Sequence, residues 1–109
     1  MRLAWLFGLV LFVFGCAIAD NAVDRAAINV QGARLFLSGQ ITSRTPLNFE
    51  AAIAANPQVS TIVPLDMAGS LDELAVYRMG YFIRDAGLNT HLTAQSEIYS
   101  GAVSLFLAG

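Results

Sequence analysis

Ser100 is the residue best placed for chemistry, because it stands directly before the mostly apolar run Gly101 to Ala108. This run is predicted to be a helix, so the free backbone N–H groups of its first turn and its positive dipole end would lie beside the Ser100 hydroxyl. Such donors stabilise the oxyanion that forms when a serine attacks an acyl carbonyl. Serine is also a favoured N-cap residue, so Ser100 needs no role other than to begin this helix. Taken alone, the stretch favours the N-cap.

The turn at residues 66–69 is the second stretch that could contribute to a site, because it joins a predicted buried strand to a predicted helix. Gly69 has no Cβ, so the backbone there can approach a ligand closely and turn its N–H group outward. A glycine that only makes the strand-to-helix turn explains the sequence equally well.

His91 is the only histidine of the chain and precedes Ser100 in the predicted strand 90–94. A surface or core strand position is favoured for it over a role as catalytic base. The glycine-flanked serine elbow of α/β-hydrolases is not indicated, since Ile98 stands where its first glycine would be. One histidine and one cysteine, Cys16, cannot form a histidine cluster or a thiolate metal site. We therefore expect no metal and no cofactor.

The elements that must position these residues alternate between strand and helix. They are predicted as a strand at 33–37, a helix from 45 to the stop at 56–57, a strand at 59–65, a helix at 70–88, a strand at 90–94 and a helix at 101–108. Thr45 is expected to cap the first helix, and Ser70 and Glu73 are expected to begin the second as a capping box. Three strand–helix units with short connections favour the fold class α/β, with a mainly parallel sheet and right-handed crossovers.

Residues 1–19 have the parts of a secretory signal peptide, namely Arg2, a charge-free apolar run and small residues that end at Ala19. Cleavage after Ala19 is the first expectation. A bacterial lipobox ending in Cys16 is the second, and a retained membrane anchor is the third. All three place the rest of the chain outside the cytoplasm, in the periplasm or secreted. Residues 20–32 are expected to form an N-terminal arm, and residues 33–109 a single domain.

The charged residues argue against one class of partner. The chain carries six arginines, no lysine and eight acidic residues, so its formal net charge is −2. Without a basic cluster it has no electrostatic footprint for nucleic acid. Membrane contact is expected only through the leader or a lipidated Cys16.

Together, the turn at 66–70 and the stretch around Ser100 resemble the Clp protease/crotonase superfamily. The shared pattern is a strand, a Ser-x-Gly-Gly-like turn, a long helix ending in Ala-Gly, a strand, and a serine before an apolar run that closes on Ala-Gly. The chain looks most like exported, ClpP-like bacterial proteins, over about residues 35–109. The resemblance implies a partial ClpP/crotonase-like fold with Ser100 as the nucleophile. It also implies that the N–H groups of Gly69 and Gly101 are the oxyanion donors.

The sequence departs from the family in the turn and at its end. Asp66 stands where exported members often have serine, Ala68 replaces the first glycine, and Tyr99 replaces the alanine before the nucleophile. The family's histidine and acid follow the nucleophile, and this sequence stops at Gly109.

Two interpretations of function follow from these departures. The first is a truncated serine-hydrolase-related domain that is inactive as this chain, whereas its full-length relatives act on peptide or acyl substrates. The second is a non-enzymatic exported or lipid-anchored domain for binding or assembly. In both, an apolar tail at 103–107 without its covering elements predicts self-association.

Overall fold

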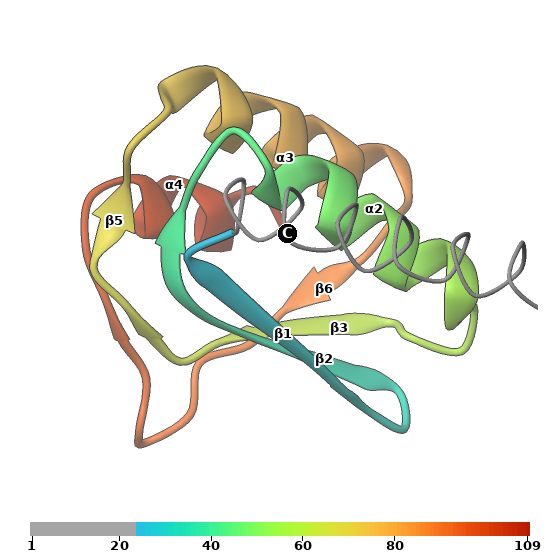
Figure 1. Cartoon of the computed structure of the whole chain (residues 1–109). Coiled ribbons are helices and arrows are strands. Elements are labelled where there is room, and N and C mark those ends of the chain that lie inside the picture. Colours follow the sequence, from blue (N-terminus) through green and yellow to red (C-terminus); the bar gives the residue numbers. More distant parts are fainter. Residues whose placement is uncertain (1–23) are drawn as a thin grey trace, which may run out of the picture.

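The computed structural model describes residues 24–109, which form a mixed α/β fold with a mostly parallel sheet (Figure 1). Residues 1–23, which hold the predicted signal peptide and Cys16, lie outside the described part. The elements are β1 (Ala26–Gln31), β2 (Arg34–Ile41), α2 (Thr45–Ala55), β3 (Thr61–Pro64), β4 (Asp66–Met67), β5 (Gly69–Ser70), α3 (Glu73–Asp85), β6 (Asn89–Thr90), β7 (Glu97–Ile98) and α4 (Gly101–Leu107).

The main sheet has the strand order β1-β2-β3-β6. β1 is antiparallel to β2, whereas the pairs β2–β3 and β3–β6 are parallel. The short strand β5 also pairs in parallel with β2, with Gln40 opposite Gly69 and Ile41 opposite Ser70. β4 forms a separate, two-stranded parallel sheet with β7. The predicted α/β class with a mainly parallel sheet is confirmed at this level.

The N-terminal part of the described chain belongs to the sheet. Ala26, Ile28 and Val30 are half-buried and alternate with exposed residues, as expected for a strand with one covered face. β1 turns into β2 at Gly32, whose φ of +61° suits glycine. The prediction of an arm outside the fold is therefore wrong for residues 26–31.

Within residues 24–109, helices α2, α3 and α4 lie above the main sheet in Figure 1, and α2 lies next to α3. Phe49 of α2 and Phe82 of α3 meet edge to face, with ring centroids 5.8 Å apart. The core between helices and sheet is made of apolar side chains that are completely buried: Leu35, Leu37, Ile41, Phe49, Ile62, Met67, Met79, Ile83, Ala102 and Leu105. The packing of these side chains in one cluster holds the helices against the sheet.

Two helix starts differ from the prediction. Thr45 does not cap α2. Arg44 takes the N-cap position without a side-chain bond, and Thr45 is the buried first residue of the helix. For α3, the capping box of Ser70 and Glu73 is wrong, because Ser70 lies in β5 and Asp72 is the N-cap. The Asp72 carboxylate accepts hydrogen bonds from the N–H groups of Leu74 and Ala75, at 3.0 and 3.3 Å.

Two connections are also longer and more structured than expected. Residues 66–69 do not form a simple strand-to-helix turn, since they contain β4 and the start of β5. The predicted strand 90–94 ends at Thr90, and the chain then makes a loop before β7. These two short strands, β4 and β7, bring the ends of the two connections together.

Candidate functional site

The pairing of β4 with β7 positions Ser100. Asp66 lies opposite Glu97, Met67 lies opposite Ile98, and the Tyr99 N–H donates to the Met67 carbonyl at 3.1 Å. Continued by two residues, this parallel register places Gly69 level with Ser100. A glycine and a serine that are thirty-one positions apart in the sequence are thus brought side by side at the start of α4.

Ser100 has a backbone conformation that serine rarely adopts, with φ 54° and ψ −120°. Within residues 24–109 it is the one residue other than glycine with a positive φ. Such a conformation costs on the order of 1–3 kcal/mol and is concentrated at functional sites. A sharp, strained turn from a strand into a helix is also how the nucleophile elbow of α/β-hydrolases exposes its serine. The glycines of that elbow motif are absent from this sequence, yet the strained serine turn is present.

Glycines lie on both sides of Ser100. Gly69 has φ +117°, and a Cβ built on it would lie 3.2 Å from the Ser100 Cβ and 3.8 Å from its Oγ. Gly101 follows Ser100 in the chain and opens α4. The next two N–H groups of the helix, from Ala102 and Val103, donate to the carbonyls of Tyr99 and Ser100. Among the hydrogen bonds of residues 24–109, none uses the N–H of Gly101.

The Ser100 cavity has a volume of about 130 Å³ and opens between α3, α4 and β5. Its lining residues are Ser70, Glu73, Val76, Tyr77, Ser100, Gly101 and Ser104. Ser70 packs so closely on Gly101 that a Cβ there would lie 2.7 Å from the Ser70 Oγ. The cavity therefore depends on glycine at position 101, and its lining combines three serine hydroxyls and the Tyr77 phenol with one carboxylate, that of Glu73.

His91 is not part of this cavity. Its N–H donates to the Ile62 carbonyl at 2.9 Å, and its side chain is exposed at the start of the loop after β6. Of the two positions expected for His91, at the surface or in the core of a strand, the structure shows an exposed one, but the residue follows the strand and does not lie within it. No imidazole lines the Ser100 cavity in the part of the chain that the structure describes.

Sequence reasoning missed four residues of the cavity: Ser70, Glu73, Tyr77 and Ser104. Ser70 and Glu73 were both assigned to a capping box, which hid them. Glu73 and Tyr77 are four residues apart on α3, and Ser100 and Ser104 are four apart at α4. This is the spacing that places side chains on one helix face, so it was the available signal.

A scan of the chain against protein-family models gave no match, and a comparison with curated protein sequences gave none either. Over residues 24–109, none of the helices has the length and apolar character needed to span a bilayer. The same residues contain no group of three histidine, cysteine, aspartate or glutamate side chains that could hold a metal ion.

Proposed function

We propose that residues 24–109 carry the nucleophile and the oxyanion donors of a ClpP-like serine hydrolase, and that they bind an acyl carbonyl at Ser100. The observation that carries this proposal is the strained backbone of Ser100 between Gly69 and Gly101. Strain of this kind is unfavourable for folding, so its presence at an exposed serine supports a role for the hydroxyl. The resemblance to the ClpP/crotonase superfamily assigns the same three residues.

In the proposed reaction, the Ser100 Oγ forms a bond to the carbonyl carbon of an ester or amide, and the carbonyl oxygen becomes an oxyanion. The N–H of Gly101, which has no hydrogen-bond partner within residues 24–109, stabilises that oxyanion. The N–H of Gly69 lies in the parallel β2–β5 pairing, so it must leave this pairing to act as the second donor. The Ser100 proton passes to water as the bond forms, and collapse of the tetrahedral intermediate breaks the ester or amide bond, so that the alcohol or amine leaves with a proton and an acyl ester stays on Ser100. The cavity offers no imidazole for this step, so we expect slow acylation by activated reagents and no efficient turnover.

A second candidate is a binding or assembly domain that keeps this fold without catalysis. The observation in its favour is the position of His91, which is exposed outside the cavity, so that no imidazole of residues 24–109 lines the cavity beside Ser100. In that case the cavity would bind a carbonyl or carboxyl group reversibly, without a covalent intermediate.

The test uses a fluorophosphonate probe on the purified protein, with the modified residue mapped by mass spectrometry. We expect slow, stoichiometric labelling of Ser100 that is lost in Ser100→Ala. Ser104→Ala is the matched control, because Ser104 lines the same cavity and should leave labelling unchanged. His91→Ala should also leave it unchanged.

Two results would contradict the proposal. A complete absence of labelling at Ser100 would leave the binding domain as the better explanation. Loss of labelling in His91→Ala would mean that this histidine reaches Ser100, and it would refute the expected lack of a base. Hydrolysis of 4-nitrophenyl acetate, followed over time, separates acylation without turnover from true catalysis.

We further propose that the protein is exported, on the basis of the signal-peptide pattern in residues 1–19. N-terminal sequencing of the protein from the extracytoplasmic fraction should begin at Asp20. A lipid-bearing Cys16 would instead identify a lipoprotein, and an intact Met1 in the membrane fraction would identify an anchor.

A further inference from the structure

The outer face of α3 carries large apolar side chains that no other part of residues 24–109 covers. Leu74, Tyr77 and Tyr81 are 75%, 54% and 72% exposed. Met79 and Ile83 lie on the opposite face of the helix and are buried in the core. Exposed apolar residues that gather on one helix face mark an interaction surface.

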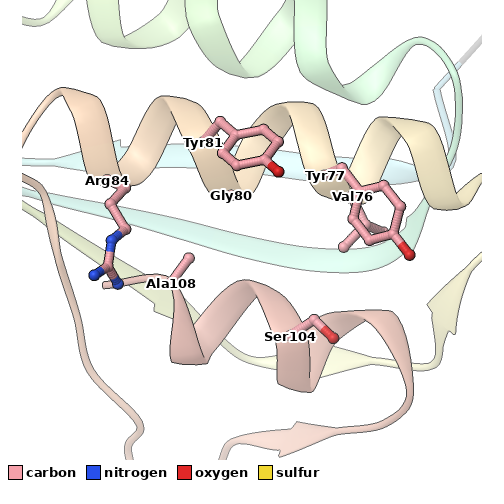
Figure 2. Close-up of a pocket in the computed structure, with 7 residues that line it drawn as sticks. All are labelled: Val76, Tyr77, Gly80, Tyr81, Arg84, Ser104 and Ala108. Carbon is pink, nitrogen blue, oxygen red and sulfur yellow. The ribbon is translucent and has the colours of Figure 1, made fainter.

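A groove of about 210 Å³ runs along this face between α3 and α4 (Figure 2). Tyr77 and Tyr81 stand on its α3 side, and Ser104 and Ala108 stand on its α4 side. The helices approach closely at Gly80, where an added Cβ would lie 3.6 Å from the Cβ of Ala108. Small residues at this point leave room for side chains from another molecule.

Two opposite charges flank the groove at the two ends of α3. Glu73 is the first residue of the helix, and Arg84 lies in its last turn and borders the groove. Eleven residues separate them, which is about three turns and about 16 Å. They therefore lie on the same flank of the helix, beside the row formed by Tyr77 and Tyr81.

We propose that this face binds a second copy of the chain through an antiparallel pair of α3 helices. A two-fold axis near the middle of α3 places Glu73 opposite the partner's Arg84, and Arg84 opposite the partner's Glu73. The same axis brings Tyr77 next to the partner's Tyr81. In antiparallel helix pairs, matching flanks face each other, so a charge pattern that reverses along one flank is self-complementary. Each ion pair is then formed twice, as two-fold symmetry requires.

A second copy fits this face better than a lipid surface does. Helices that bind membranes carry an excess of lysine and arginine around their apolar face. At α3, by contrast, Asp72, Glu73 and Asp85 outnumber Arg78 and Arg84, and Arg78 is already paired with Glu50 at 2.8 Å. A pair of short helices lies at the small end of protein interfaces, so the dimer is expected to be weak, with a micromolar or weaker dissociation constant.

The test measures the dissociation constant by sedimentation equilibrium, on protein recovered from cells that express the full chain. Glu73→Arg and Arg84→Glu each replace two favourable contacts with two like-charge contacts, so each should weaken the dimer about tenfold. Tyr81→Asp should weaken it at least as much, because it removes aromatic contacts and places a charge in the groove. Arg34→Glu, an exposed charge reversal on the β1–β2 hairpin, is the matched control and should have no effect.

The decisive measurement mixes the two single variants. A heterodimer of Glu73→Arg with Arg84→Glu restores both ion pairs, so the mixture should associate with nearly the wild-type constant while each variant alone does not. A monomer up to millimolar concentration would overturn the proposal. So would a dimer that is insensitive to these changes, or a mixture no tighter than its components. None of these results depends on the reactivity of Ser100.

Discussion

The two helices that border the Ser100 cavity begin in opposite ways. α3 follows β5 and starts at Asp72, whose extended backbone (φ −147°, ψ 108°) lets its carboxylate accept two N–H hydrogen bonds. α4 follows β7 and starts at Ser100, whose backbone is strained and whose side chain makes no capping bond. One start is capped as helix starts usually are, and the other leaves the Ser100 hydroxyl and the Gly101 N–H without hydrogen-bond partners among residues 24–109.

The difference separates a structural helix start from a candidate functional one. A serine in the ordinary N-cap conformation would direct its oxygen to the helix N–H groups, as Asp72 does. Ser100 instead keeps its oxygen beside Gly69 and the cavity. Ser100 therefore occupies the N-cap position of α4 without a side-chain cap, which is consistent with the proposed role of its hydroxyl.

Among the variants that test this comparison of helix starts, Gly69→Ala is expected to change the free energy of unfolding most. Alanine at φ +117° is strained, and its Cβ would press on the Ser100 side chain. We expect the free energy of unfolding to fall by about 2–3 kcal/mol, as measured by urea denaturation. Gly32→Ala is the control, since φ is +61° there and an added Cβ meets nothing within 4 Å. A similar loss in both variants would show that the contact with Ser100 contributes little.

Asp72→Ala, at the capped start of α3, should have the next largest effect on the free energy of unfolding. Loss of the cap and of a negative charge at the helix N-terminus should lower the free energy of unfolding by about 1.5 kcal/mol. Ser70→Ala, at the position that the sequence suggested for the cap, should cost clearly less. A larger loss in Ser70→Ala than in Asp72→Ala would contradict the observed start of α3.

Ser100→Gly should change stability in the other direction. Glycine adopts the backbone conformation at position 100 without strain, although it has more freedom to lose on folding, so we expect a net gain of about 1 kcal/mol. Ser100→Ala keeps the strain and should leave the free energy of unfolding almost unchanged. Both variants should lose fluorophosphonate labelling. Destabilisation by Ser100→Gly would mean that the hydroxyl contributes to folding.

The sequence predicted most of the regular elements but not the interactions that decide their ends. The end of α2 at Asn56 and the start of α4 at Gly101 follow from local residue types, and both are observed. Ser70 and Asp72 are both good N-cap residues, and the choice between them is tertiary. Pairing of β5 with β2 holds Ser70 in a strand, so the cap moves to Asp72. β1 was missed because its alternation of small and apolar residues is short.

The candidate site was predictable only in part. The resemblance named Ser100, Gly69 and Gly101, and the structure places Gly69 beside Ser100. That proximity depends on the pairing of β4 with β7, two strands of two residues each, which have no usable periodicity. The unusual φ and ψ of Ser100 could not be predicted either, because the glycines that accompany such a turn in α/β-hydrolases are absent.

The start of α2 allows a last and smaller test, because its support comes from outside the helix. Asp24 accepts hydrogen bonds from the hydroxyls of Thr45 and Thr42 at 2.6 and 2.9 Å, from the Ala26 N–H and from the Asn48 amide. Partial burial raises the pKa of Asp24. The hydrogen bonds from Thr45, Ala26, Asn48 and Thr42 lower the pKa by more than burial raises it, so the pKa lies below its ordinary value. The charged form is therefore favoured in the folded protein.

A lowered pKa in the folded state gives a stabilisation that is complete above the unfolded-state pKa of about 3.9 and is lost as pH falls through the folded value. We expect Asp24 to contribute less than about 1 kcal/mol in this way, since water still screens much of the carboxylate. Asp24→Asn should lower stability at neutral pH and flatten its decline below pH 4. Asp66→Asn, an exposed carboxylate change in β4, should leave that decline unchanged. An acid transition of equal steepness in the wild type and Asp24→Asn would show that Asp24 does not support the start of α2, and that the buried Thr45 is held there by its packing and its hydrogen bonds with Thr42.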